Sequence, residues 1–288
     1  MTSSRPSRAS VARRLRPVVG ALAVLLLLPV LLAPGASALG RAGIDVGGDD
    51  GADLYRGTGG LVWRAGDWRG DEPGRQRSAS CAGCEWRITS YCTRLEYDAG
   101  GCPGSHDGCA AGTIRVRVWL REPPGPWEQV GTACLGDGPP VTVDGIGGRV
   151  RDEAVALLPP LRAGMQPSGG ALVGLPALFR TGQPADGLVG SDLSVLGFDV
   201  VLDARVRWYW SWGDGSAGWA SSPGGRYPDV SLSHTYRRGG AASAEVTSVW
   251  RGQYTVEGLG PFAVPGDPLT QTAVLPVQVR EARAVLVG

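Results

Sequence analysis

The chain has 288 residues, with 28 basic residues, 27 acidic residues and a formal net charge of +1. A protein that binds nucleic acid needs a basic face to neutralise phosphates, so this balance argues against such a partner. The length allows two ordinary domains, and all six cysteines fall in the first half.

Residues 1–38 have the order of a signal peptide, with a basic start, an apolar run from Val18 to Ala33 and a small-x-small site at residues 36–38. We expect cleavage there and an extracellular, secreted chain without membrane attachment afterwards. The alternative is an uncleaved signal anchor that keeps the protein at the cell surface, because the apolar run is near the short end of a membrane span.

Residues 39–79 are rich in Gly, Asp and Arg and have little apolar periodicity. This composition predicts a flexible segment, with one short strand around Leu61 to Trp63 as an option.

Residues 80–146 are predicted to form a small disulfide-rich β unit. Apolar residues alternate along Thr113 to Arg121, which is typical of a half-buried strand, and Trp127 to Cys134 is its expected partner. An even number of cysteines in an exported chain indicates disulfides, and fifteen connectivities stay open. Zinc binding and a redox pair are weaker alternatives. The cysteines are Cys81, Cys84, Cys92, Cys102, Cys109 and Cys134.

Residues 147–166 contain one helical pattern. Val150, Ala154 and Leu157 recur at helical spacing, and Pro159-Pro160 then ends the pattern. We expect one short helix here and a hinge between the two halves.

Residues 167–288 show short apolar segments divided by Gly, Pro and Asp clusters. This spacing is typical of a β-sandwich. The expected strands are 171–179, 198–202, 205–212, 230–236, 245–250, 253–256 and 273–279.

The stretch RWYWSWGDGS (residues 207–216) places Trp208, Trp210 and Trp212 on one face of a strand. With three indoles on one side, that face is expected to point inward. Gly213-Asp214-Gly215 then supplies the positive-φ positions and the side-chain acceptor of a tight turn.

This stretch, followed by SHTYRRGG at residues 233–240, resembles the PKD domain. The resemblance implies an immunoglobulin-like β-sandwich and a structural role for His234 beside the turn. More faintly, the layout is similar to a group of secreted actinobacterial proteins without an established activity. The motif positions are Trp210, Trp212, Gly213, Asp214, Gly215, His234 and Tyr236.

The chain departs from the PKD pattern where large residues are usual, because Ala242 and Ala244 stand there. Small residues at core positions would leave cavities that cost stability. We expect Trp208 and Trp250 to fill that space.

Trp219 and Tyr227 belong to a segment that strand alternation does not explain. With Tyr209 they are candidates for a ligand platform that holds sugar rings or a partner's side chain. The alternative is a Trp packed beneath its own loop.

No Gly-x-Ser-x-Gly elbow and no His-Glu-x-x-His occurs, so we expect no enzyme, cofactor or metal. The favoured function is a secreted, non-enzymatic cell-surface interaction or spacer protein whose partner is an extracellular protein or a cell-wall glycan. A carbohydrate-binding module using Trp219 and Tyr227 is the alternative. A hydrolase with an unrecognised site in the cysteine-rich half is the second alternative.

Overall fold

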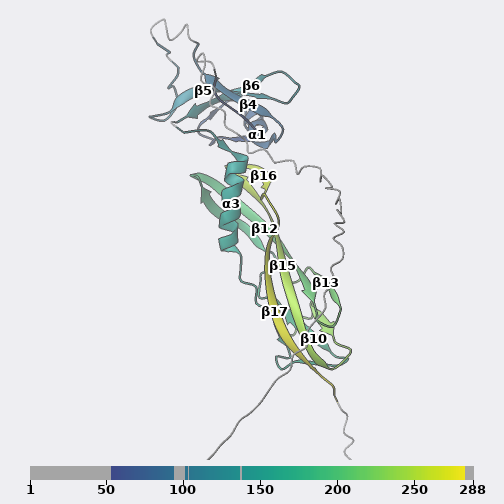
Figure 1. Ribbon diagram of the computed structural model, residues 1–288. Coiled ribbons are helices and arrows are strands. Elements are labelled where there is room, and N and C mark those ends of the chain that lie inside the picture. The colour runs from purple at the N-terminus through teal and green to yellow at the C-terminus, as the bar shows by residue number, and fades with distance from the viewer. Residues whose placement is uncertain (1–52, 94–100, 103, 137, 283–288) are drawn as a thin grey trace, which may run out of the picture. The chain divides into compact units, whose positions relative to one another are not determined.

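The computed structural model describes residues 53–93, 101–102, 104–136 and 138–282, so the expected signal peptide and residues 39–52 lie outside the described part. The described chain is mainly β (Figure 1). It contains two helices and three disulfides. This confirms the expected mainly β class and the disulfides. Neither described helix is long and apolar enough to cross a membrane.

The first part of the described chain is built around a five-stranded sheet of order β1-β4-β5-β6-β3, and β2 pairs separately with β7. The elements are β1 (Asp53–Thr58), β2 (Leu61–Val62), β3 (Trp68–Arg69), α1 (Glu72–Ser80), β4 (Glu85–Ser90), β5 (Ile114–Arg121), β6 (Glu128–Leu135) and β7 (Val141–Thr142).

The prediction of a flexible segment is wrong for residues 53–79, which hold β1, β3 and most of α1, whereas β2 confirms the short strand expected around Leu61. β1 pairs with β4 and β3 pairs with β6, so these strands are held by residues distant in sequence. Leu61, Val62 and Trp68 of these strands are buried, as is Trp63 just after β2. Asp71 caps α1 by accepting from the Gly74 amide, and Pro73 stands in its first turn.

β5 and β6 confirm the antiparallel pair that alternation predicts. Val116, Val118 and Leu120 are fully buried, while Ile114 at the strand's start is 40% exposed. Trp86 and Ile88 of β4 join them in one apolar cluster, which is the core of this sheet.

The long helix α3 (Val143–Leu157) begins earlier than the sequence pattern indicates. Its Thr142 cap accepts from the Gly145 amide. Three glycines near the start weaken helix propensity and hide that first turn in the sequence. The helix ends before Pro159, as predicted, whereas α1 is a second helix that was not predicted. The hinge role of α3 stays a prediction.

The second part of the described chain holds a seven-stranded sheet and a three-stranded sheet. The seven-stranded sheet has the order β11-β12-β15-β17-β9, with β13 paired to β12 and β16 to β15, and the other sheet has the order β14-β10-β8. Figure 1 shows β12, β15 and β17 running side by side. The strands are β8 (Gly164–Gln166), β9 (Ala171–Leu172), β10 (Pro176–Arg180), β11 (Leu188–Val195), β12 (Phe198–Ser211), β13 (Ala217–Ala220), β14 (Ser233–Thr235), β15 (Gly240–Val256), β16 (Leu259–Ala263) and β17 (Leu269–Arg280).

Several strand boundaries differ from the predicted ones. β12 and β15 each run through a break expected from sequence, the expected strand 171–179 is divided into β9 and β10, and β11 was not predicted. Continuous pairing of β12 with β15 from Val200 to Ser211 explains the absent breaks, because each strand holds the other extended.

Alternation along β12 places its tryptophans in the core, as predicted. Trp208 and Trp210 are fully buried and Trp212 is 8% exposed. Their cluster includes Phe179 of β10, so residues of both sheets share it, and Trp250 and Ala244 of β15 belong to it as well.

Candidate functional site

The motif residues of the C-terminal half form one stack of rings at the end of β12. Trp212 lies parallel to Trp210 on one side and to His234 on the other, with ring centroids 4.9 and 4.7 Å apart. Tyr236 meets His234 edge-on at 4.7 Å, and its hydroxyl donates to the Trp212 carbonyl. The structure therefore brings the two separated motifs together.

Asp214 links the turn to this stack. One of its carboxylate oxygens lies 2.8 Å from His234 Nε2, and the other accepts from the Ser216 amide and hydroxyl. Burial acts to raise the pKa of Asp214, but the hydrogen bonds from Ser216 and His234 outweigh it and lower the pKa to about 2. Burial, helped by the Asp214 charge, raises the pKa of Tyr236 to about 12.

The glycines on either side of Asp214 fit the backbone of the turn. Gly213 has φ 78° and Gly215 has φ 91°, values that favour glycine. A Cβ on Gly213 would also lie 2.5 Å from the Ser243 carbonyl oxygen, so β15 passes too close for any side chain there.

A surface hollow of about 580 Å³ lies beside the turn, lined by Asp214, Ser216, His234 and Arg237 among others. Its groups are not arranged as a nucleophile with its base, because the Ser216 hydroxyl bonds to the carboxylate and not to the imidazole. A metal site here would need further carboxylates. Within the described residues, no group of three or more His, Cys, Asp or Glu side chains is placed to hold an ion.

Trp219 is on strand β13 and is 53% exposed, so the alternative of a Trp packed beneath its own loop is wrong. It lies opposite Tyr209 of β12, with ring centroids 5.2 Å apart and the rings edge to face. The guanidinium of Arg207 lies 5.0 Å from the Trp219 ring centroid. These three side chains form an exposed patch on the face of β12 that is opposite the buried indoles.

Tyr227 belongs to a different surface. It is 73% exposed, and its amide donates to the side chain of Gln166. With Arg180 and Arg226 it lines a hollow of about 360 Å³. The ring contacts found for Trp219 are with Tyr209 and Arg207, so the described structure does not join Trp219 and Tyr227 in one platform.

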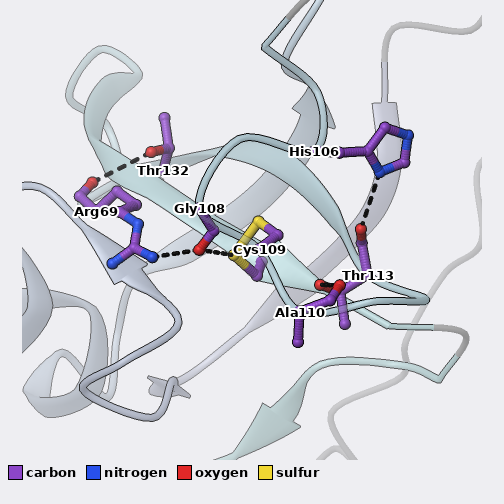
Figure 2. The surroundings of a disulfide bond; sticks show 8 residues. Arg69, His106, Gly108, Cys109, Ala110, Thr113 and Thr132 are labelled. Carbon is purple, nitrogen blue, oxygen red and sulfur yellow. Dashed lines mark hydrogen bonds between the residues drawn. A yellow bond between two sulfur atoms is a disulfide. The ribbon is translucent and has the colours of Figure 1, made fainter.

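The six cysteines pair as Cys81–Cys84, Cys92–Cys102 and Cys109–Cys134, which resolves the connectivity that the sequence left open. Figure 2 shows the last of these, where the Arg69 guanidinium donates to the carbonyl of Gly108 beside the disulfide. His106 Nδ1 lies 3.2 Å from the Thr113 carbonyl oxygen on the same loop. The histidine of the cysteine-rich half thus contacts a backbone acceptor and not a nucleophilic side chain.

A second group of aromatic and charged side chains, which are partly buried on and beside β4 and β5, was not identified from the sequence. The guanidinium of Arg87 lies 5.2 Å from the Trp119 ring centroid, and that of Arg115 lies 5.1 Å from the Tyr91 ring centroid. The alternate arginines of the β5 sequence IRVRVWLR are the signal that could have found it.

Comparison of the chain with protein-family models, curated proteins and solved structures finds no match.

Proposed function

We propose that the chain is a secreted, non-enzymatic protein that acts at the cell surface as an interaction module. We further propose that residues 167–288 form a PKD-like β-sandwich. Two features support the PKD assignment. The motif residues bond to one another around the Asp214 turn, and the core of this half takes residues from both sheets. Three disulfides and the signal-like residues 1–38 support export.

The observation that carries the interaction proposal is the exposure of Trp219 on a strand with a fixed position. Its neighbour β12 is held from behind by the buried indoles, so the patch of Arg207, Tyr209 and Trp219 lies on a preformed surface. Trp, Tyr and Arg are the residues most enriched at binding hot spots. A rigid patch loses little conformational entropy on binding.

A carbohydrate ligand is the second candidate for this patch, because an exposed indole can pack against a sugar ring. The separation of Tyr227 from Trp219 weakens the two-ring platform expected from sequence. A protein partner is therefore favoured over a neutral glycan at this site.

The test is retention of the purified chain on cell envelopes of the producing organism. We expect retention of the wild-type chain, a loss of about tenfold for Trp219→Ala, and no change for the matched control Tyr227→Ala. Protease treatment of the envelopes should abolish retention if the partner is a protein and preserve it if the partner is a glycan. Equal retention of Trp219→Ala and wild type would show that this patch is not the contact surface.

A further inference from the structure

The outward face of the five-stranded sheet carries arginines and aromatic rings in alternation. β5 buries Val116, Val118 and Leu120, so its intervening residues project from the opposite face. β4 contributes to the same face, because Arg87 lies directly opposite Trp119 in the register. We call this surface the arginine–aromatic face. Its members are Arg87, Tyr91, Arg115, Arg117, Trp119, Arg121 and Trp127.

The first group on this face is a row in which cations and rings alternate. The Arg87 guanidinium carbon lies 5.2 Å from the Trp119 ring centroid and 4.7 Å from that of Trp127. Arg121 lies 4.9 Å from the Trp127 ring centroid. The Trp119 indole is held in place because its N–H donates to the Thr89 hydroxyl at 2.9 Å. The row is therefore fixed by contacts within the sheet.

The second group is centred on Tyr91, just after β4. The guanidinium carbons of Arg115 and Arg117 lie 5.1 and 5.6 Å from its ring centroid. Both arginines come from β5, two residues apart, so they project side by side. A ring contact satisfies the flat face of a guanidinium, and because the Nε of Arg115 is buried, its terminal amino groups are the donors that a ligand could reach.

The positive charge of this face is largely uncompensated. Arg121 forms an ion pair with Glu85. In the part of the chain that the structure describes, Arg87, Arg115 and Arg117 have neither a carboxylate partner nor a hydrogen-bond acceptor. The sheet therefore gathers three guanidinium groups without a described carboxylate partner on one face.

A hollow of about 460 Å³ adjoins the row of rings, lined by Arg56, Glu85, Arg87, Arg121 and Trp127 among others. This volume falls within the range of about 300 to 1,000 Å³ that is typical of small-molecule sites. It offers guanidinium donors beside an indole face, which is the combination that a charged sugar residue would use.

We propose that the arginine–aromatic face binds an acidic glycan, a sugar chain that carries carboxylate or phosphodiester groups. Guanidinium groups bind both of these anions through paired hydrogen bonds, and indole faces pack against sugar rings. A neutral glycan would not need several unpaired arginines. The choice of a glycan over a nucleic acid depends on the proposed export and on the net charge of +1. This surface is distinct from the Trp219 patch.

The simplest competing explanation is that the cation–π contacts only stabilise the sheet, each contributing about 0.5–1 kcal/mol at exposed sites. Binding to immobilised polymers separates the two. The probes are hyaluronan, which carries carboxylates, wall teichoic acid, which carries phosphodiesters, neutral dextran, and a single-stranded oligonucleotide. Each is measured at about 50 and 300 mM salt, because screening weakens binding that depends on charge.

We compare Arg115→Gln/Arg117→Gln with the control Arg237→Gln/Arg238→Gln, which removes the same charge from exposed residues outside this face. We expect wild type to bind at least one of the acidic glycans in a salt-sensitive manner and not dextran. The first variant should bind about tenfold more weakly and the control as wild type does. Binding to hyaluronan or to teichoic acid alone identifies which anion is recognised.

If the double variant does not fold, Arg117→Gln alone is tested. Its ring contact is the longest on this face, so its loss should disturb folding least. We then expect binding to be about threefold weaker. Three results would overturn the proposal: no binding of wild type to either acidic glycan at low salt, an equal loss in the control, or tighter binding to the oligonucleotide. Because envelopes carry acidic glycans, retention is also measured with Trp219→Ala in the Arg115→Gln/Arg117→Gln background, so either proposal can fail while the other stands.

Discussion

Replacement of Asp214 by Asn tests whether the turn is stabilised by the charge of its carboxylate. The pKa of Asp214 falls from its ordinary 3.8 to about 2 in the folded protein. One pKa unit corresponds to about 1.4 kcal/mol, so the full shift would be worth about 2 kcal/mol. The side chain is 28% exposed, and solvent screening reduces the expected contribution to about 1 kcal/mol.

The pH dependence of this contribution has a definite sign. The pKa of Asp214 is lower in the folded state than in the unfolded state, so the ionised carboxylate stabilises the fold above about pH 4. That stability disappears as the pH falls through 3.8 toward 2 and the carboxylate becomes protonated. Asp214→Asn should therefore be less stable than wild type at pH 7 and nearly equal to it at pH 2.

Urea unfolding at pH 7, 4 and 2 measures this difference through the shift in midpoint at constant slope. Tryptophan fluorescence is a suitable signal, because Trp212 stacks directly on the His234 ring that Asp214 holds. Asp229→Asn is the matched control. Asp229 also accepts from a serine two residues later, and those bonds lower its pKa, but it is fully exposed and has no histidine partner. It should cost less.

An equal gap between wild type and Asp214→Asn at pH 7 and at pH 2 would refute this reasoning. Such a result would mean that the shape of the side chain, and not its charge, stabilises the turn. A control that costs as much as Asp214→Asn would contradict the role of His234.

Two further predictions concern packing and disulfides. Trp250 is 2% exposed, so Trp250→Ala should lower the free energy of unfolding, measured in urea, by about 3–5 kcal/mol. The control is Trp219→Ala, which should cost less than about 1 kcal/mol because Trp219 is half exposed. A loss below about 1 kcal/mol for Trp250→Ala would contradict its role in filling core space. Cys109→Ala/Cys134→Ala removes a disulfide between residues 25 apart in sequence and should lower the free energy of unfolding by about 3 kcal/mol. Alkylation of the unreduced wild-type chain, followed by intact-mass measurement, should detect no free thiol.

Alternation within a single strand was enough to predict the core of each half. The residues of β5 and β12 point to opposite faces with a period of two, so the burial of Val116, Val118, Trp208 and Trp210 follows from the sequence. Helix α3 was only partly predicted, because its first turn is rich in glycine and depends on the Thr142 cap.

Elements held by distant partners were not predictable in this way. β1 has few apolar residues, and the apolar residues of β11 are interrupted by Gly190, Ser191 and Asp192. Both strands are extended because β4 and β12 pair with them. Such pairing leaves no periodic signal in the sequence. The arginine–aromatic face was only partly visible in the sequence. The alternate arginines of β5 are a local signal, but Arg87 and Tyr91, which contact residues of β5 or the Trp127 ring, come from a distant segment.

The two halves share one arrangement, in which a strand uses its inner face for a core and its outer face for arginine and aromatic residues. On β12 the outer residues include Arg207 and Tyr209, and on β5 they include Arg117 and Trp119. Distant sites usually contribute to stability independently. Substitutions on the arginine–aromatic face, which is on a different sheet from the Asp214 turn, should therefore alter binding without altering the cost of Asp214→Asn.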